Sequence, residues 1–135
     1  MEVAALLNNA SGVMDCNVYG VQVDSAEGKA GMAAINVSSE FNFSSFIEHV
    51  NENLNSFQRP YFLRLTSDMK TTGTFKHQKE DLKKQGFDPN LISDKLYFYQ
   101  KDSYVEIDNN LFKRISFNQS TNYYWGRKKI LLRAD

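Results

Sequence analysis

One stripe of apolar side chains constrains the fold of this chain more than any other feature. Between residues 42 and 54, apolar residues recur at i, i+3, i+4, i+7 and i+11, the spacing of one helical face. Asn42 stands directly before them and is a favourable N-cap residue. The pattern predicts an amphipathic helix whose buried face needs a second layer to pack on. The stripe consists of Phe43, Phe46, Ile47, Val50 and Leu54.

Two short runs before the stripe, 17–23 and 32–37, are rich in β-branched residues and predict strands. The segment between them, 25–31, contains Gly28 and Gly31, which are typical of a turn. Two strands joined by a short turn predict an antiparallel β-hairpin.

Three further strands are predicted after the stripe. Pro60 opens the first of them, and we expect Arg64 to be its solvent-facing member. The last two strands are expected to form a small hairpin that turns at Lys101 and Asp102. The three runs are 61–65, 95–100 and 103–107.

Three other segments predict helices. The middle one is short and charged and is expected to end at Gly86 in a left-handed cap, and Asp108 is expected to cap the last one. The chain shows no internal repeat. The order of elements predicts an α+β domain, with a short β-hairpin plus a mixed sheet on which the helices pack. The three segments are 2–7, 79–85 and 110–115.

Composition narrows the class of protein. The chain has 135 residues, enough for one domain with a core, and 41% of them are hydrophobic. Sixteen basic and sixteen acidic residues give zero net charge, which argues against a general nucleic-acid or membrane-surface binder. The tail 127–135 carries four basic residues against Asp135, a charge of +3, which permits a weak membrane-surface role. The lone Cys16 cannot form an internal disulfide, and this indicates a reducing compartment.

No set of residues forms a self-sufficient active site. His49 and His77 are far apart in sequence, and no cysteine, histidine and carboxylate cluster has metal-ligand spacing. His49 is interpreted as a surface histidine, and Cys16 as a buried structural thiol. The segment 27–31 lacks the spacing of a phosphate-binding loop and is interpreted as a hairpin turn. Four aromatic residues are assigned mostly to the core: Phe41, Phe43, Phe46 and Phe57.

The segment "TTGTFKHQK", residues 71–79, is short, polar and basic. Residues 71–74 are not expected to hold regular structure, and Phe75 is suited to anchor the segment. From the residues alone, Lys76 is either a reagent carried on a loop or a solvated charge. His77 and Lys79 are interpreted as solvated neighbours rather than phosphate contacts.

Four stretches carry a resemblance to a known family: "GKAGMAAI" (28–35), "QRPYFLRL" (58–65), "TGTFKHQKEDLKKQGFDP" (72–89) and "DKLYFY" (94–99). Over residues 2–117, the chain resembles the C-terminal domain of the fatty acid transport proteins, or very-long-chain acyl-CoA synthetases. These are a branch of the acyl-adenylate-forming ligases. The resemblance identifies 1–117 as the small mobile C-terminal domain of an AMP-binding enzyme, and leaves 118–135 as an unassigned extension.

The resemblance implies a reaction in two halves. A long or very long chain fatty acid reacts with ATP to give an acyl-adenylate, and coenzyme A then displaces AMP to give the thioester. A large N-terminal domain holds ATP, the acyl chain and Mg²⁺, and the small domain swings over it. Lys76 matches the lysine that serves adenylation, supported by Gly73, Thr74 and Phe75. No metal is expected on this chain.

The resemblance also implies that the hairpin at 25–31 lies near the coenzyme A nucleotide. Lys29, with Gly28, is the candidate for a phosphate contact, although a solvated turn is the alternative. The partner that the resemblance implies is the adenylation domain of the same enzyme, and nucleic acid is not an expected partner. The location it implies is cytoplasmic, with peripheral membrane association of the parent enzyme permitted.

The chain departs from the family pattern because the N-terminal domain is missing from it. It is therefore expected to be an excised domain or a truncated product, folded but inactive by itself. The alternative is a stand-alone interaction or regulatory domain that kept the fold without the catalysis. The extension at 120–135 contains enough apolar residues to pack somewhere, and a pairing element is one option for it.

Overall fold

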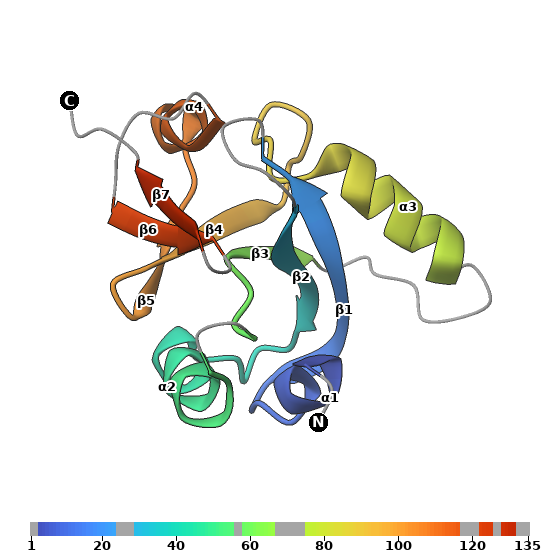
Figure 1. The fold of residues 1–135 in the computed structure, drawn as a ribbon. Coiled ribbons are helices and arrows are strands. Elements are labelled where there is room, and N and C mark those ends of the chain that lie inside the picture. Colours follow the sequence, from blue (N-terminus) through green and yellow to red (C-terminus); the bar gives the residue numbers. More distant parts are fainter. Residues whose placement is uncertain are drawn as a thin grey trace.

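The computed structural model shows one mixed five-stranded sheet in the strand order β1-β2-β3-β4-β5 (Figure 1). It describes residues 3–23, 29–55, 58–66, 75–116, 122–125 and 128–131, with only the backbone for Lys29, 75–79 and the last two ranges. β2 and β3 are parallel, and the other neighbouring strands are antiparallel. The strands are β1 (Val13–Gln22), β2 (Lys29–Val37), β3 (Phe62–Thr66), β4 (Lys95–Gln100) and β5 (Ser103–Glu106).

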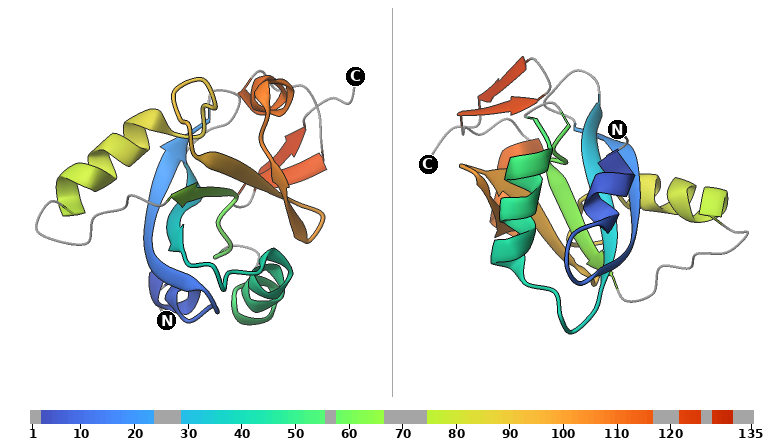
Figure 2. Two further views of the ribbon diagram at one scale, coloured as in Figure 1. Left: turned by 180° about the vertical axis from the view of Figure 1, so that it is seen from behind. Right: turned by 90° about the horizontal axis from the view of Figure 1, so that it is seen from below.

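Helices cover both faces of this sheet (Figure 2). α1 (Val3–Asn8) and α2 (Phe43–Asn53) pack on one face, and α3 (Phe75–Gln85) and α4 (Asn109–Ser116) on the other. The alternation of side chains along each strand divides the core in two. In β2, for example, Met32 and Ala34 face α3, whereas Ala33 and Ile35 face α2. The predicted α+β fold with a mixed sheet is confirmed, and the first hairpin is part of that sheet.

The predicted caps and the second hairpin are confirmed. The Asn42 side-chain oxygen accepts a hydrogen bond from the Ser45 backbone N–H at 3.0 Å, and Asp108 caps α4 through the Leu111 N–H at 2.8 Å. Lys101 and Asp102 both have left-handed backbone angles, with φ of 51° and 63°. That geometry suits a two-residue turn between twisted antiparallel strands.

The turn predicted at 25–31 is wrong at its second half. β2 begins at Lys29, which pairs with Gln22, and Gly31 pairs with Gly20 inside the ladder. The Gly31 carbonyl also accepts a hydrogen bond from the Tyr61 N–H at 2.9 Å. These backbone contacts extend the strand through a glycine that resembled a turn residue, because long-range pairing overrides local preference.

Two further strands, β6 (Asn122–Trp125) and β7 (Lys128–Leu131), pair antiparallel in a separate sheet. Both strands lie within the extension 118–135 that the sequence left unassigned. Their pairing agrees with the option of a pairing element for this segment. The division of the chain at residue 117 remains a prediction.

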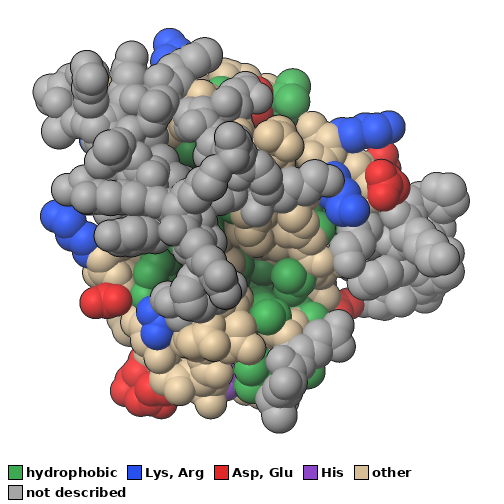
Figure 3. Space-filling view, viewed as in Figure 1, with side chains coloured by type: hydrophobic (Ala, Val, Ile, Leu, Met, Phe, Trp, Pro, Cys, Tyr) green, Lys and Arg blue, Asp and Glu red, His purple; other side chains and the backbone are tan. Residues whose placement is uncertain are grey.

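Figure 3 shows basic and acidic side chains scattered over the visible face, with no large area of one sign among the described residues. This agrees with the zero net charge of the chain. None of the described helices combines the length and apolar character needed to span a bilayer.

Candidate functional site: helix α3 and its seat

Lys76 is the second residue of α3, not part of a loop. The sequence predicted a helix only from residue 79, so the prediction of a loop through 75–79 is wrong. From Phe75 to Gln85 the chain contains no glycine or proline and is rich in lysine and glutamine, which favour a helix. The side chains of 75–79, and the supporting residues Gly73 and Thr74, lie outside the described parts of the chain.

α3 extends from the sheet with its C-terminal end nearest the core and its N-terminal end projecting away (Figures 1 and 2). Among its described side chains, Leu82 alone is buried, whereas Glu80, Asp81 and Lys84 are exposed. The backbone of the lysine-bearing end therefore lies away from the buried contact made by Leu82.

A glycine and an aromatic ring hold the C-terminal end of α3. Gly86 has a φ of +57°, and its N–H donates to the Leu82 carbonyl at 3.0 Å, which confirms the predicted left-handed cap. Phe87 follows and stacks on Phe62, with ring centroids 4.2 Å apart. Phe112 of α4 packs edge-on against Phe87 at 5.4 Å. The end of α3 is thus fixed in the core between β3 and α4.

Arg64 is not the solvent-facing residue that the sequence predicted. Its side chain is 13% exposed, and its Nε donates to Asp94 Oδ2 at 2.8 Å. Its Nη1 donates to Oε1 of Gln85, the last residue of α3. Arg64 alternates with buried Leu63 and so shares the α3 face of β3 with Phe62, where a charged side chain needs partners.

Two buried polar side chains lie on the same face of the sheet. Asn17 is 1% exposed and Tyr19 is 4% exposed, and neither the Asn17 amide nor the Tyr19 hydroxyl has a hydrogen-bond partner. In the register, Asn17 pairs with Ala34, and Ala34 pairs with Arg64. Burial raises the pKa of the Tyr19 phenol, and the positive charge of Arg64 partly opposes that rise.

The two lysines singled out by the sequence are not brought together. Lys29 begins β2 opposite Gln22, and Gln22 lines a hollow beside the C-terminal end of α3. Lys76 lies nine residues before that end, or about 14 Å along the helix axis. The Lys29 side chain and Gly28 lie outside the described parts of the chain, so a phosphate contact there stays a prediction.

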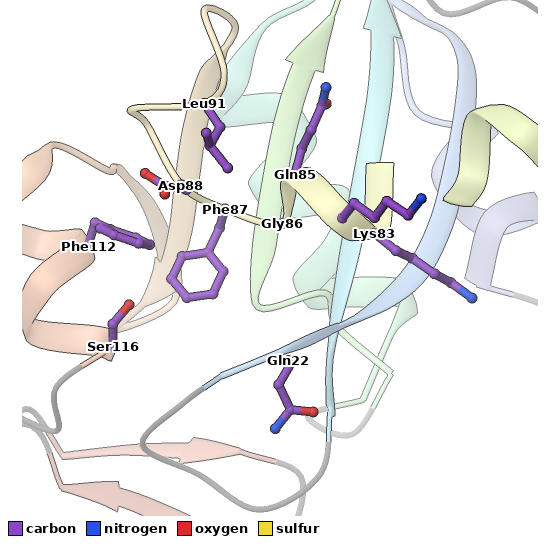
Figure 4. Close-up of a pocket in the computed structure, with 10 residues that line it drawn as sticks. Gln22, Lys83, Gln85, Gly86, Phe87, Asp88, Leu91, Phe112 and Ser116 are labelled. Carbon is purple, nitrogen blue, oxygen red and sulfur yellow. The ribbon is translucent and has the colours of Figure 1, made fainter. Parts of the chain in front are cut away.

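The hollow has a volume of about 210 Å³ and was not anticipated from the sequence. Figure 4 shows the Phe87 ring pointing into it, between Phe112 and Gln22. Residues from β1, α3 and α4 meet here only in the fold, so no local pattern in the sequence marks it. The lining is completed by Lys83, Lys84, Gln85, Gly86, Asp88, Leu91 and Ser116.

Cys16 and His49, which the sequence analysis weighed as possible catalytic or metal-ligating residues, both lie against backbone carbonyl oxygens of α1. Cys16 is buried, as predicted, with its Sγ 3.2 Å from the Ala4 carbonyl oxygen. His49 is half-buried rather than on the surface, because its Nε2 lies 2.7 Å from the Leu6 carbonyl oxygen of α1. The described residues contain no group of three or more metal-ligating side chains.

No protein-family model matches the chain. The chain is 40% identical over 118 residues to long-chain fatty acid transport protein 2 of Rattus norvegicus. It is 44% identical over 117 residues to long-chain fatty acid transport protein 1 of Mus musculus, and each match covers 84% of the chain. This chain is a homologue of the long-chain fatty acid transport proteins. The homologous segment spans only 19% and 18% of the lengths of these two relatives.

A solved structure shares the fold of this fatty acid transport protein homologue. It is the fatty acyl CoA synthetase of Mycobacterium tuberculosis, with a TM-score of 0.51 at 16% sequence identity. The match covers 62% of this chain and 17% of that one. The domain therefore has the fold of the small C-terminal domain of adenylate-forming enzymes, as the sequence resemblance predicted.

Proposed function

We propose that this chain is the C-terminal domain of a fatty acyl-CoA synthetase and that Lys76 serves its adenylation half-reaction. In that reaction, a fatty acid carboxylate attacks the α-phosphate of ATP and releases pyrophosphate. Coenzyme A then displaces AMP and forms the thioester. The observation that carries the proposal is the identity of 40–44% to fatty acid transport proteins across 84% of the chain.

The charge at the start of α3 supports the role of Lys76. The first five residues of the helix include Lys76, His77 and Lys79, and its first turn contains no acid. A helix N-terminus also carries partial positive charge from unpaired backbone N–H groups. Carboxylate and phosphate are both anionic, so their approach is favoured beside a compact ammonium that offsets the charge developing between them.

The projecting position of this end supports delivery to a second domain. The hollow beside the end of α3, at about 210 Å³, is smaller than the roughly 300–1,000 Å³ of ordinary small-molecule sites. The relatives are about five times longer than the matched segment. We propose that an N-terminal adenylation domain supplies the acyl and ATP sites. The described residues contain no ligand set that fits the Mg²⁺ implied by such chemistry.

Separate assays of the two half-reactions test this function. The chain is placed in mouse long-chain fatty acid transport protein 1 in exchange for the matching segment, and the unmodified mouse protein is the reference. Lys76→Ala should slow adenylate formation by on the order of a hundredfold, the usual loss for one well-placed charge donor. Thioester formation from pre-made acyl-adenylate should stay near the parent rate.

Matched variants give the controls. Lys76→Arg should rescue little, because a planar guanidinium does not occupy the position of a compact ammonium. His77→Ala and Lys79→Ala should each cost much less than Lys76→Ala. Equal losses in both half-reactions would show that Lys76 holds the domains together. No loss in either would refute the proposed role and favour a non-catalytic interaction domain.

A further inference from the structure

In its described second half, residues 80–85, α3 buries few side chains. Leu82 is the only buried side chain among those described on the helix, and three of its five described neighbours on α3 are exposed. Over residues 80–85, the apolar contact of α3 with the core is therefore limited to Leu82. A helix that buries so little apolar surface relies more heavily on each polar contact that it makes.

Polar groups beneath α3 do not add to its attachment. Asn17 and Tyr19 face the same core as Leu82, yet their buried polar atoms have no partner. A buried polar group without a hydrogen bond opposes folding, because it has lost its contact with water. These two residues make the seat of α3 less favourable, and their side chains supply no hydrogen bond to the helix.

Arg64 links the sheet to α3, because its Nη1 donates a hydrogen bond to Oε1 of Gln85, the last residue of the helix. This bond joins β3 directly to the last residue of α3. Asp94 fixes the guanidinium from the other side, at 2.8 Å. Asp94 and Gln85 thus hold the Arg64 guanidinium from two sides, beside the Gly86 cap and the Phe87 ring that fix the same end of α3.

We infer that Arg64, held by Asp94, is a positioning residue that sets through Gln85 where α3 presents Lys76. This role rests on the proposed function of Lys76. The link acts at the C-terminal end of α3. A small tilt of the helix about that end therefore moves the N-terminal end, which carries Lys76, much farther than it moves Gln85. None of these three residues touches substrate in this role. Their effect is on the placement of the ammonium.

The test uses a pair of substitutions at Gln85. Gln85→Met keeps the size of the side chain but removes the acceptor, whereas Gln85→Glu keeps an acceptor for Arg64. Lys84→Ala is the matched control, because Lys84 is an exposed neighbour on the same turn. Both Gln85 variants leave Arg64 paired with Asp94, so the buried charge is not orphaned.

The first measurement is amide hydrogen exchange on the 135-residue chain, which is independent of any activity. Gln85→Met should raise exchange in α3 by on the order of tenfold and leave β3 and β4 unchanged. Gln85→Glu and Lys84→Ala should stay near the parent chain. Unchanged exchange of α3 in Gln85→Met would overturn the link itself, whatever Lys76 does.

The second measurement is the pair of half-reactions in the fusion with the mouse protein. Gln85→Met should lower the kcat of adenylation by on the order of tenfold, with KM for ATP and the rate of thioester formation unchanged, and Gln85→Glu should restore it. A normal adenylation rate in Gln85→Met, beside a slow Lys76→Ala, would overturn the positioning role. If Lys76→Ala left the adenylation rate unchanged, the proposed function would be refuted. The hydrogen exchange of α3 in Gln85→Met would still decide whether Arg64 and Gln85 hold the helix.

Discussion

α2 and α3 are both helices of 11 residues, and the sheet holds them in opposite ways. α2 buries Phe46 and Val50 and has a capped N-terminus. Its C-terminal turn is tied by Arg59, whose guanidinium donates to the Asn51 and Leu54 carbonyl oxygens at 3.1 and 2.9 Å. α3 has one buried side chain among those described, Leu82, and a polar link at one end.

The difference shows how one sheet supports two kinds of helix. α2 has the apolar stripe that makes a helix part of the core, so removing it would remove the core of that face. α3 is charged along most of its length and is attached near its C-terminal end. Elements with few buried apolar contacts open locally at lower free energy than the rest of the domain. That property suits the role proposed for Lys76, which is to serve only one of two half-reactions.

Substitution of a buried residue in α2 and in α3 should give the largest difference in the free energy of unfolding. Phe46→Ala should lower the free energy of unfolding by about 3–5 kcal/mol, because it leaves a cavity at a fully buried site. Leu82→Ala should cost about 2 kcal/mol or less, because α3 can detach before the sheet unfolds. Urea unfolding followed by circular dichroism gives both values. Equal losses would show that α3 is as integral to the fold as α2.

Alkaline pH should test both faces of the sheet. Burial raises the pKa of the Tyr19 phenol on the α3 face and of the Tyr104 phenol on the α2 face. The folded state therefore holds these protons more tightly than the unfolded state. Stability should be intact below about pH 10 and should fall as the pH rises above it, by about 1.4 kcal/mol per pH unit for each phenol.

Free energies of unfolding measured from about pH 9 to 11 check this slope. Tyr19→Phe and Tyr104→Phe should each flatten the decline, since each removes one titrating phenol. A decline of the same steepness in both variants would assign it to other groups.

The same two substitutions at neutral pH should give the smallest but sharpest contrast. The Tyr104 hydroxyl donates to the Pro60 carbonyl at 2.7 Å, so Tyr104→Phe should cost about 1 kcal/mol and leave that carbonyl unpaired. Tyr19→Phe should cost nothing or stabilise slightly, because the Tyr19 hydroxyl has no partner to lose. Thermal unfolding of the two variants measures the difference. A comparable loss in Tyr19→Phe would mean that its hydroxyl is satisfied in solution.

Local patterns in the sequence determined most of the elements. The stripe from Phe43 to Leu54 gave α2 and its Asn42 cap, and the Gly86 cap was recognised because a left-handed residue favours glycine. The second hairpin and its turn at Lys101 and Asp102 followed from two adjacent β-type runs. These features depend on residues within one or two turns of each other, so the sequence alone contains their cause.

Only the tertiary structure decided which side chains meet. Arg64 was predicted to face solvent, but Gln85 and Asp94, both more than twenty residues away, give it partners on the α3 face. The sequence predicted a surface position for His49, but in the fold its ring lies against the Leu6 carbonyl oxygen of α1. Lys29 was predicted in a turn, but it lies in β2 because it pairs with Gln22 of β1. Lys76 was predicted in a loop, but it lies in α3. Burial and hydrogen bonding at these sites come from segments distant in the chain, and no spacing along a single sequence encodes that proximity.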